Sequence, residues 1–457
     1  MTKIAFLLNG TPVNVDDVAP TQTVLDYLRD FEKLCGTKEG CNEGDCGACS
    51  IIISDNMGVA RVANSCILLM PQIHKKAIRT VEGISSPSRE LHPIQASMIK
   101  HHGSQCGFCT PGFITTLAAA HKNGEEDFEN QIAGNLCRCT GYGPIIKSAV
   151  EASGKPVPAW MNENLELIQN VPSLSNKPNS IQAFSEYYLK NPSSVIIAGG
   201  TDIALDINRK LKTIENPIFL DDCKELTEIT VNEKYLKIGA ASTISTLLMV
   251  MRDHHPHFAE MLCRYGSIQI RNSATIGGNI ANGSPIGDCS PALIALNAIL
   301  KLRQGSNVRN VPIEDFFIDY GIQDLKEGEF IEEILIPRQS DDLRCYKISK
   351  RFDQDISALN GCFNIKISEG KVSSCRIAFG GMSSTPKRAY QVESALHGEP
   401  WNLQNLQRAS HKIGLDYSPL SDVRASSAYR LKVAQNMLTK VFYENSGIKT
   451  NIRNALV

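Results

Sequence analysis

Short stretches of alternating and clustered apolar residues at the start of the chain predict a small β-sheet. Residues 3–15 are typical of two strands joined at Asn9-Gly10, a dipeptide that tolerates positive φ at both positions of a tight hairpin turn. Residues 51–53 and 60–63 are further short apolar runs and predict two more strands. The first 85 or so residues therefore indicate a small sheet with room for one crossing helix.

Helical spacing of apolar residues predicts that helix and a helical segment after it. Residues 21–34 have apolar positions three and four apart, and Thr21 or Thr23 can cap the first turn. The pattern is again helical over residues 92–153, where Pro111 can occupy the first turn of a helix because its missing N–H is no loss there. Two further short helices are expected at residues 129–135 and 143–152.

The second half of the chain has a mixed α+β pattern. Residues 154–180 contain four prolines among several Asn and Ser residues, which predicts an exposed linker and a domain boundary. Glycine-rich turns follow up to about residue 337, and then strands are expected at 344–348, 358–367 and 372–379. Two terminal helices should close the chain. The apolar stripe of the last one is expected to lie in the core, and it consists of Leu431, Ala434, Leu438 and Val441.

Composition excludes some partners. The 457 residues include 47 Lys and Arg against 48 Asp and Glu, so no broad field of one sign is available to bind nucleic acid or an anionic membrane. The N-terminal apolar run is too short for a secretion signal, and no stretch has membrane-spanning length. Small molecules or proteins are the expected partners, and the cytoplasm is the expected location.

Cysteine usage points to metal ligands rather than disulfides. Eight of the fifteen cysteines stand in two tight groups before residue 140, whereas an extracellular disulfide framework would disperse paired residues. Buried structural thiols are expected at the other seven positions, which are Cys35, Cys223, Cys263, Cys289, Cys345, Cys362 and Cys375.

The first group has the spacing of a plant-type ferredoxin. Cys41, Cys46 and Cys49 form a C-x4-C-x2-C run, and Cys66 is a distant fourth ligand for a [2Fe-2S] cluster. Glycines within the loop would let it wrap closely and turn N–H groups towards the sulfides. The alternatives are a structural zinc site or unliganded core cysteines, although zinc ligands usually come as two short pairs.

The second group is a C-x2-C pair, Cys106 and Cys109, followed by a C-x-C pair, Cys137 and Cys139. Four thiolates on two loops between helices could bind zinc or iron. A second [2Fe-2S] cluster is the more economical interpretation beside a ferredoxin loop, because one-electron centres are useful mainly in series. The flanking segments are QCGFCTPG at 105–112 and GNLCRCTGY at 134–142.

With these segments the sequence resembles the molybdenum hydroxylase family, and within it the xanthine dehydrogenase type, over nearly the whole chain. The resemblance implies a multidomain α+β fold. It would comprise a β-grasp ferredoxin-like domain (1–88), an all-α helical [2Fe-2S] domain (89–155), a linker (156–177), an α+β FAD-binding domain (178–338) and an α+β C-terminal domain (339–457). The helical-domain cluster would lie nearest the molybdopterin, and the ferredoxin-like cluster nearer the flavin.

Two glycine-containing segments match the FAD-binding segments of this family in order and separation. They are VIIAGGTD at 195–202 and TIGGNIANGSPIGD at 275–288. Taken alone, the first could be an ordinary tight turn, although successive N–H groups in such a turn can hold a pyrophosphate. The resemblance implies pyrophosphate contacts from Ala198, Gly199, Gly200, Thr201, Thr275, Gly278, Asn279 and Ser284.

Further flavin contacts follow from the same resemblance. Asp288 would reach the adenosine ribose, and Tyr265 would stack on the adenine. Ile331 aligns with an apolar neighbour of the flavin, and Lys347 with a lysine near its ring, with a surface lysine as the alternative for Lys347. Asp202 closes the first segment where relatives have glutamate, so its role is left open.

The resemblance implies an electron relay without substrate chemistry on this chain. No G-x-G-x-x-G follows a strand, so NAD would dock against the flavin rather than on a separate Rossmann domain, and residues 349–355 resemble the family loop at that face while differing in length. Electrons from hypoxanthine or xanthine would enter at a molybdopterin centre on a separate large subunit, in a dimer of heterodimers. Rivals are a subunit of an aldehyde, nicotinate or aromatic hydroxylase and a zinc-stabilised scaffold.

Overall fold

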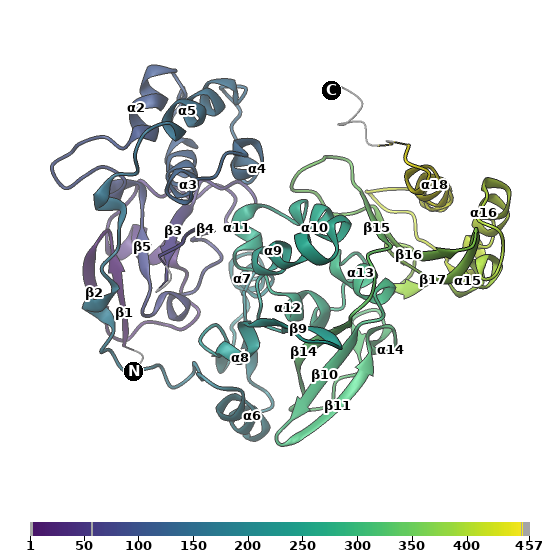
Figure 1. Cartoon of the computed structure of the whole chain (residues 1–457). Coiled ribbons are helices and arrows are strands. Elements are labelled where there is room, and N and C mark those ends of the chain that lie inside the picture. The colour runs from purple at the N-terminus through teal and green to yellow at the C-terminus, as the bar shows by residue number, and fades with distance from the viewer. Residues whose placement is uncertain (1–2, 56–57, 449, 451–457) are drawn as a thin grey trace. The chain divides into compact units, whose positions relative to one another are not determined.

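The computed structural model describes residues 3–55, 58–448 and 450, and the chain forms two compact units (Figure 1). The first unit comprises residues 1–184, 193–224 and 266–274. The second comprises residues 185–192, 225–265 and 275–457. Helices α6 (Ile181–Lys190) and α8 (Lys224–Thr227) run across these boundaries in the sequence.

The first unit is built on a five-stranded sheet with the order β2-β1-β5-β3-β4. Its strands are β1 (Ile4–Leu8), β2 (Thr11–Val15), β3 (Ser50–Ser54), β4 (Ala60–Asn64) and β5 (Ala77–Arg79). The predicted hairpin is confirmed: β1 and β2 are antiparallel, and the turn places Asn9 and Gly10 at φ 51° and 83°. Strand β5 lies parallel to β1 and antiparallel to β3, which gives the mixed sheet of a ferredoxin-like fold.

The helix predicted at residues 21–34 is shorter and less regular than expected. It comprises α1 (Val24–Asp26) followed by one π turn, η1 (Tyr27–Phe31), and Thr23 is the residue that caps it. A π turn takes an extra residue, so the apolar positions lose their common face. Phe31, one of the apolar positions at helical spacing in residues 21–34, is therefore 66% exposed.

Four α-helices make up the helical part of the first unit. They are α2 (Pro93–Lys100), α3 (Thr110–Asn123), α4 (Phe128–Ile132) and α5 (Gly143–Ser153). Helix α3 has Pro111 in its first turn, as predicted, and ends at Gly124 in the left-handed region. Its buried Phe113 and Leu117 share one core with Ile52 of β3 and Val62 of β4 (Figure 1). The helices are thus packed directly on the sheet.

The segment predicted to be an exposed linker is partly packed. Within residues 156–177 the short 3-10 helices η4 (Ala159–Met161) and η5 (Leu165–Ile168) bury Met161 and Ile168. The Glu163 carboxylate forms a buried ion pair with Arg79 of β5, at 2.7 Å. Prolines stop regular helix or strand in this segment, but apolar and charged anchors still hold it on the sheet.

A buried lysine, Lys177, attaches the end of this segment to the residues that follow β7 (Pro217–Phe219), a strand paired with β6 (Val195–Ile197). The Lys177 side chain is fully buried, and its Nζ lies 3.0 Å from carboxylate oxygens of both Asp221 and Asp222. Burial alone would lower the pKa of Lys177, but the two carboxylates more than offset it, and the pKa is raised. Lys76 provides a second cation for Asp221, at 2.6 Å.

Replacing Lys177 by methionine should destabilise the first unit by about 1–3 kcal/mol, because Asp222 loses its cation in a half-buried site while Asp221 keeps Lys76. The exposed Lys147 on α5, changed in the same way, is the matched control. Chemical unfolding of both variants measures the difference. Equal unfolding midpoints for the two variants would show that the ion cluster contributes nothing to stability.

The second unit contains a five-stranded antiparallel sheet with the order β11-β10-β14-β9-β8. Its strands are β8 (Ile229–Val231), β9 (Tyr235–Gly239), β10 (Ile299–Gln304), β11 (Asn307–Pro312) and β14 (Phe330–Pro337). A two-stranded ribbon, β12 (Phe317–Asp319) and β13 (Ile322–Gln323), precedes β14. The helices between these strands in the sequence are α9 (Ile244–His254), α10 (Pro256–Cys263), α12 (Ile276–Ala281), α13 (Cys289–Ala295) and α14 (Ile313–Phe316), of which α10 and α13 also contact the C-terminal strands β15 to β17.

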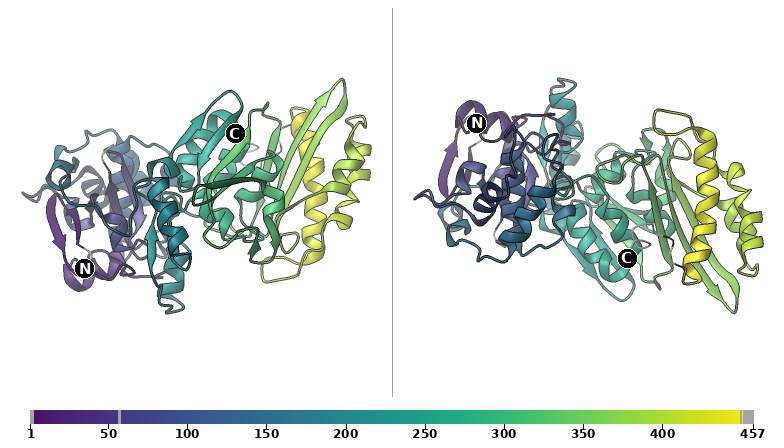
Figure 2. Two further views of the ribbon diagram at one scale, coloured as in Figure 1. Left: turned by 90° about the horizontal axis from the view of Figure 1, so that it is seen from below. Right: turned by 90° about the horizontal axis from the view of Figure 1, so that it is seen from above.

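A separate four-stranded sheet, β15-β16-β17-β18, forms the C-terminal part of the second unit (Figure 2). Its strands are β15 (Leu343–Ile348), β16 (Leu359–Ser368), β17 (Lys371–Gly380) and β18 (Lys387–Arg388). Instead of the two terminal helices predicted, the described residues here form four, which are α15 (Tyr390–Leu396), α16 (Leu403–Ser410), α17 (Ile413–Asp416) and α18 (Ser427–Asn445). In α18 the predicted stripe is confirmed as core, with Leu431 at its half-buried edge.

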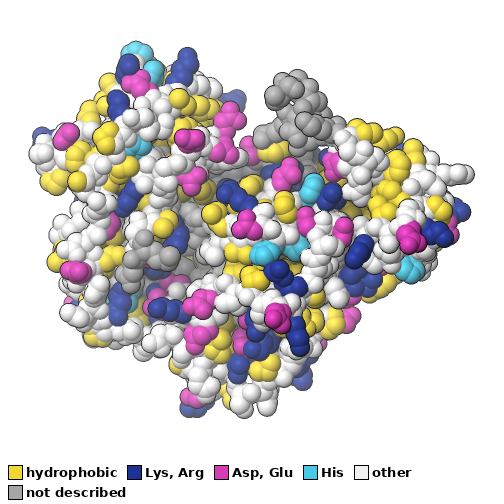
Figure 3. Space-filling model, viewed as in Figure 1, with side chains coloured by type: hydrophobic (Ala, Val, Ile, Leu, Met, Phe, Trp, Pro, Cys, Tyr) yellow, Lys and Arg dark blue, Asp and Glu magenta, His cyan; other side chains and the backbone are white. Residues whose placement is uncertain are grey.

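Figure 3 shows Lys and Arg side chains interspersed with Asp and Glu on the face in view, as the balanced composition leads one to expect. In the portion of the chain that the structure describes, every helix is too short or too polar to span a bilayer.

Candidate functional site

The first cysteine group is assembled by the β3–β4 hairpin and the loop that precedes it. Ser50 and Asn64 are opposite each other in the antiparallel register, so Cys49, one residue before Ser50, and Cys66, two residues after Asn64, are brought together. Their Sγ atoms lie 3.3 Å apart, and both side chains are buried. Cys41 and Cys46 form a second pair within the loop, with their thiols close enough to shift each other's pKa.

Hydrogen bonds make one member of each pair a good thiolate. The backbone N–H groups of Glu43, Asp45 and Cys46 point at Cys41 Sγ from 3.3–3.4 Å. Donation from the Cys46 thiol and from these N–H groups lowers the pKa of Cys41 to about 5, against the opposing effect of burial. The pKa of Cys46 is raised, mainly because its thiol is the donor. A metal cation in place of the shared proton would allow both sulfurs to be thiolates.

Glycines make this wrapping possible at two positions. A Cβ on Gly40 would lie 2.7 Å from Cys46 Sγ, and Gly47 has φ 68°, a conformation that L side chains rarely adopt. The tight loop aims its amide groups at sulfur, which is the donor environment that an iron-sulfur cluster requires.

The second cysteine group lies at the N-termini of two helices. Cys109 is the residue before α3, and Cys137 and Cys139 are in the loop before α5. Cys109 lies beside Cys137, and Cys106 beside Cys139, close enough for one thiol of each pair to shift the pKa of the other. Burial, with the hydrogen bond to Cys137, raises the pKa of Cys109 to about 12. Cys137 Sγ accepts from the N–H groups of Cys139 and Thr140, each at 3.4 Å, and Cys106 and Cys139 are exposed.

All eight predicted ligands are therefore brought together as four pairs in two groups. Two pairs per group suit a [2Fe-2S] cluster, in which each of two iron ions takes two thiolates, better than the single tetrahedral ion of a zinc site. Over residues 3–55, 58–448 and 450, no three Cys, His, Asp or Glu side chains converge on one point, as the ligands of a single metal ion would.

The first flavin segment lies in the first unit, between β6 and α7 (Ile203–Asn208). Gly200 has φ 75°, and a Cβ on Gly199 would lie 2.1 Å from the Ser273 carbonyl oxygen, so both positions require glycine. Gln72 donates from Nε2 to the Ala198 oxygen at 3.1 Å and fixes the turn. Burial raises the pKa of Asp202, and the neighbouring Asp206 adds to that effect.

The second flavin segment lies in the second unit and begins as the first turn of α12. Thr275 caps this helix through Oγ1, which accepts from the Gly278 N–H at 3.2 Å. Asn279 donates from Nδ2 to the Tyr265 hydroxyl at 3.2 Å, while its buried Oδ1 has no hydrogen-bond partner among the described residues. An unpaired acceptor beside a helix N-terminus and a tyrosine fits a polar cofactor. Ser284 follows α12, and Ile331 is buried on β14.

Asp288 and Lys347 form one buried group. Lys347 Nζ lies 2.5 Å from Asp288 Oδ2, and Ser357 and Asn360 donate to Oδ1. Lys347 is 6% exposed, which overturns the alternative of a surface lysine. The Asp288 carboxylate already accepts hydrogen bonds from three side chains. A ribose hydroxyl that contacted it, as predicted, would have to donate beside these three. Both flavin assignments stay predictions.

If Asn279 contacts the cofactor, replacing it by leucine should lower the FAD content of the purified protein and leave its iron content unchanged. The reason is that Oδ1 and Nδ2 would both be lost next to the helix N-terminus. Asn307→Leu, at an exposed position of β11, is the control. Flavin released by denaturation and iron measured on the same sample provide the test, and full flavin occupancy in Asn279→Leu would contradict it.

Sequence reasoning missed several buried or half-buried amides that hold these loops. Asn208 of α7 donates to the Cys66 carbonyl at 2.7 Å, and Asn135 donates to the Gly47 carbonyl at 3.0 Å. Gln269, of α11 (Ile268–Arg271), contacts the same region. Apart from Thr116, which is 19 residues from Asn135, the partners of these amides lie 85 to 219 residues away in the sequence, so no local spacing marks them.

The remaining cysteines partly depart from expectation. Five are buried, but Cys35 is exposed and Cys263 is half-buried, so the prediction of buried structural thiols is wrong for these two. Cys35 lies in the loop after η1, where the chain is already leaving the helix.

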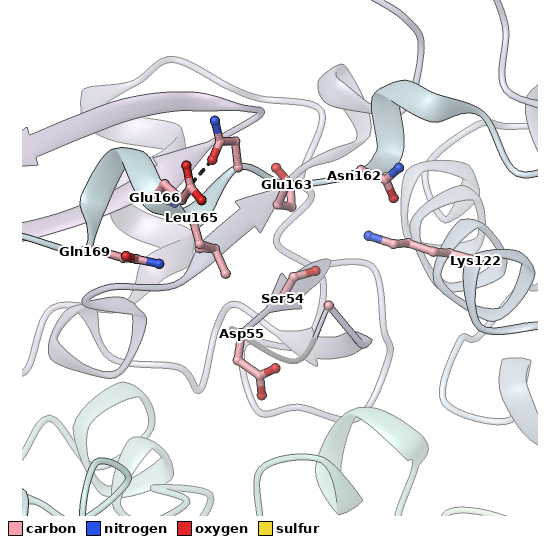
Figure 4. A pocket seen from close by; sticks show the side chains of 10 residues that line it. Ser54, Asp55, Lys122, Asn162, Glu163, Leu165, Glu166 and Gln169 are labelled. Atoms are coloured by element: carbon pink, nitrogen blue, oxygen red, sulfur yellow. Dashed lines mark hydrogen bonds between the residues drawn. The ribbon is translucent and has the colours of Figure 1, made fainter.

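A polar cavity of about 300 Å³ lies elsewhere in the first unit (Figure 4). Ser54, Asp55, Lys122, Asn162 and Gln169 are among its lining residues. The Lys122 ammonium donates to the Met161 carbonyl at 2.7 Å, and Glu163, which also lines the cavity, is paired with Arg79. Lys122 and Glu163 therefore already have partners within the protein. None of the predicted site residues lines it.

Four family models match successive parts of the chain. Residues 6–70 match the 2Fe-2S iron-sulfur cluster binding domain, and residues 80–150 match the [2Fe-2S] binding domain. Residues 172–339 match the FAD binding domain in molybdopterin dehydrogenase, and residues 344–445 the CO dehydrogenase flavoprotein C-terminal domain. The domain types predicted from the sequence are thereby confirmed.

Relatives in sequence include xanthine dehydrogenase 2 of Arabidopsis thaliana, 29% identical over 90% of this chain and 37% of its own length. Xanthine dehydrogenase of Emericella nidulans is 30% identical over 87% of this chain and 35% of its own length. The chain thus spans little more than a third of these relatives. Among solved structures, carbon monoxide dehydrogenase from Hydrogenophaga pseudoflava is 26% identical with a TM-score of 0.55, over 58% of this chain and 93% of that one.

Proposed function

Because this chain belongs to the molybdenum hydroxylase family and is the iron-sulfur and FAD electron-transfer part of such an enzyme, we propose that it serves a xanthine dehydrogenase. The substrate pair would be hypoxanthine and xanthine, oxidised to urate, with NAD as the final acceptor. When bound, the two [2Fe-2S] clusters carry electrons singly, and FAD gathers two of them for hydride transfer to NAD.

The observation that carries the proposal is the pairing of all eight cysteines. Each pair supplies two sulfurs to one iron position, and the amide groups around Cys41 and Cys137 supply donors to the sulfurs. The protein's part in the reaction is to hold these positions and set their potentials through ligation, N–H donation and burial. Cys49 and Cys66 are buried, whereas Cys106 and Cys139 are exposed, so the two sites differ in solvation.

The flavin residues are proposed in two sets. In the first unit, the turn at Ala198, Gly199, Gly200 and Thr201 offers backbone N–H groups to a pyrophosphate. In the second unit, Thr275, Gly278, Asn279 and Ser284 would bind phosphate oxygens, with Tyr265 and Asp288 for the adenosine and Ile331 and Lys347 near the flavin ring. Asp202 is included in the cofactor site without an assigned contact.

A partner subunit is part of the proposal. The relatives are almost three times as long as the part that this chain matches, and the molybdopterin site is proposed to lie on a separate large chain, in a dimer of heterodimers. The cytoplasm is the proposed location. A different substrate is the second candidate, because the carbon monoxide dehydrogenases among the solved structures share the flavoprotein part.

The proposal is tested on anaerobically purified protein, alone and with the large chain that co-purifies. We expect about four iron ions and one FAD per chain, two distinguishable paramagnetic signals after reduction, and bleaching of the visible spectrum by NADH. The complex should reduce NAD with xanthine. Zinc in place of iron would overturn the relay, whereas turnover of an aldehyde or of carbon monoxide but not xanthine would overturn only the substrate.

A further inference from the structure

The two cluster-bearing loops meet across a buried polar network in the first unit. The Leu136 N–H, one residue before Cys137, donates to the Cys46 carbonyl at 3.0 Å. Asn135, which precedes Leu136, donates from Nδ2 to the Gly47 carbonyl at 3.0 Å. The backbone of one cysteine group is therefore hydrogen-bonded directly to the backbone of the other.

The side chain at the centre of this network comes from a distant part of the sequence. Gln269 of α11 donates from Nε2 to Asn135 Oδ1 at 3.0 Å, to Ser50 Oγ at 3.1 Å and towards Thr116 Oγ1 at 3.4 Å. Ser50 follows the ligand Cys49 directly, and Asn135 is two residues before Cys137. One amide thus contacts a neighbour of each cysteine group.

The hydrogen bonds of Gln269 lie in a closely packed interior and are not chance contacts at the surface. Gln269 is fully buried, and Asn135, Thr116 and Ser50 are at most 2% exposed. A Cβ on Gly134 would lie 2.0 Å from Gln269 Oε1, so the Gln269 side chain fits only because residue 134 is glycine. Gln269 Oε1 has no hydrogen-bond partner among the described residues, an unfavourable feature for a merely structural amide in a core.

Gln269 belongs to a short segment that leaves the second unit and returns to it. Residues 266–274 belong to the first unit, although the residues before and after them, up to Tyr265 and from Thr275, belong to the second. Helix α11 packs beside β4, and Asn272 donates to the Val62 carbonyl of that strand at 2.9 Å (Figure 1). A segment of the flavin half of the sequence is thus built into the iron-sulfur unit.

We propose that Gln269 is a positioning residue that sets the separation of the two [2Fe-2S] clusters by hydrogen bonding to both cluster-bearing loops. The proposal rests on the assignment of two clusters to this chain. Its physical basis is that a buried, hydrogen-bonded network allows one arrangement of the loops, whereas an apolar residue in the same space leaves Asn135 and Ser50 to find other partners. Electron transfer and magnetic dipolar interaction both depend steeply on the distance between the clusters.

The test compares Gln269→Met with Gln169→Met. Methionine keeps the length and volume of glutamine but cannot donate a hydrogen bond, and Gln169 is an exposed residue of the same unit. Iron and flavin contents are measured first. The fully reduced proteins are then compared by low-temperature EPR for the splitting that each cluster causes in the signal of the other, and by flash-induced reduction for the rate of transfer between clusters.

We expect Gln269→Met to retain its iron, to lose part of the splitting and to transfer electrons more slowly between clusters, while Gln169→Met matches the unaltered protein. Unchanged splitting and rate in an iron-loaded Gln269→Met would overturn the proposal and leave the proposed function intact. Absence of iron from the unaltered protein would instead overturn the proposed function.

A milder variant covers the case in which Gln269→Met loses iron. Ser50→Ala removes the hydroxyl through which Gln269 Nε2 is bonded to the first cysteine group, with only a small change in side-chain volume. The same two readouts then decide: reduced splitting at full iron content supports the proposal, and unchanged splitting overturns it.

Discussion

Replacing Cys49 by alanine should halve the iron content of the protein, from about four to about two ions per chain, and abolish one of the two paramagnetic signals. Cys49 is paired with Cys66 across the β3–β4 hairpin, and its loss leaves one iron position of the ferredoxin-like cluster with a single thiolate. A single thiolate, with only the amide oxygen of Asn64 near the vacated position, should not hold iron there, so the whole cluster should be lost. The helical-domain signal, from the group that contains Cys109 and Cys137, should persist.

The control is Cys35→Ala, which changes an exposed cysteine between the same domain's helix and loop. It should retain full iron and both signals. NADH added to Cys49→Ala should still reduce FAD but should no longer reduce the remaining cluster at the normal rate, since the ferredoxin-like cluster is its proposed link to the flavin. Retention of four iron ions by Cys49→Ala would contradict the ligand assignment.

The second large effect is expected from Gly112→Ala in the first turn of α3. An added Cβ would lie 2.3 Å from the Gly47 carbonyl oxygen and 3.2 Å from the Ala48 Cα, both backbone atoms of the first cysteine loop. These atoms cannot move without disturbing the hydrogen bonds around Cys46, so helix and loop must separate. We expect a destabilisation of about 3 kcal/mol, at the upper end for overpacking, and poor loading of both clusters.

Gly143→Ala, at the start of α5, is the matched control because nothing lies near the position of its Cβ. Thermal unfolding, with iron content measured before heating, separates the two variants. A Gly112→Ala protein that loads four iron ions and unfolds with the midpoint of Gly143→Ala would show that α3 and the cysteine loop are not in contact in solution.

The structure also explains why some sequence predictions held and others did not. The Asn9-Gly10 hairpin and helix α3 follow local rules, positive φ at a tight turn and a proline in a first helical turn, and both are present as predicted. Phe31 followed the helical period and is nevertheless exposed, because a π turn after Asp26 shifts the register. Residues 156–177 looked exposed by composition, yet Met161 and the Arg79–Glu163 pair attach them to the sheet.

The sequence by itself determined the chemistry, because ligand identity and spacing are local properties. C-x4-C-x2-C and C-x2-C with C-x-C name the sulfurs and their order, and the glycine turns name where a backbone can approach a phosphate. Only the tertiary structure decided which sulfurs are paired and which residues hold the two groups against each other. Cys49 meets Cys66 through strand register, and Gln269 reaches Asn135 from 134 residues away, through contacts that exist only once the chain has folded.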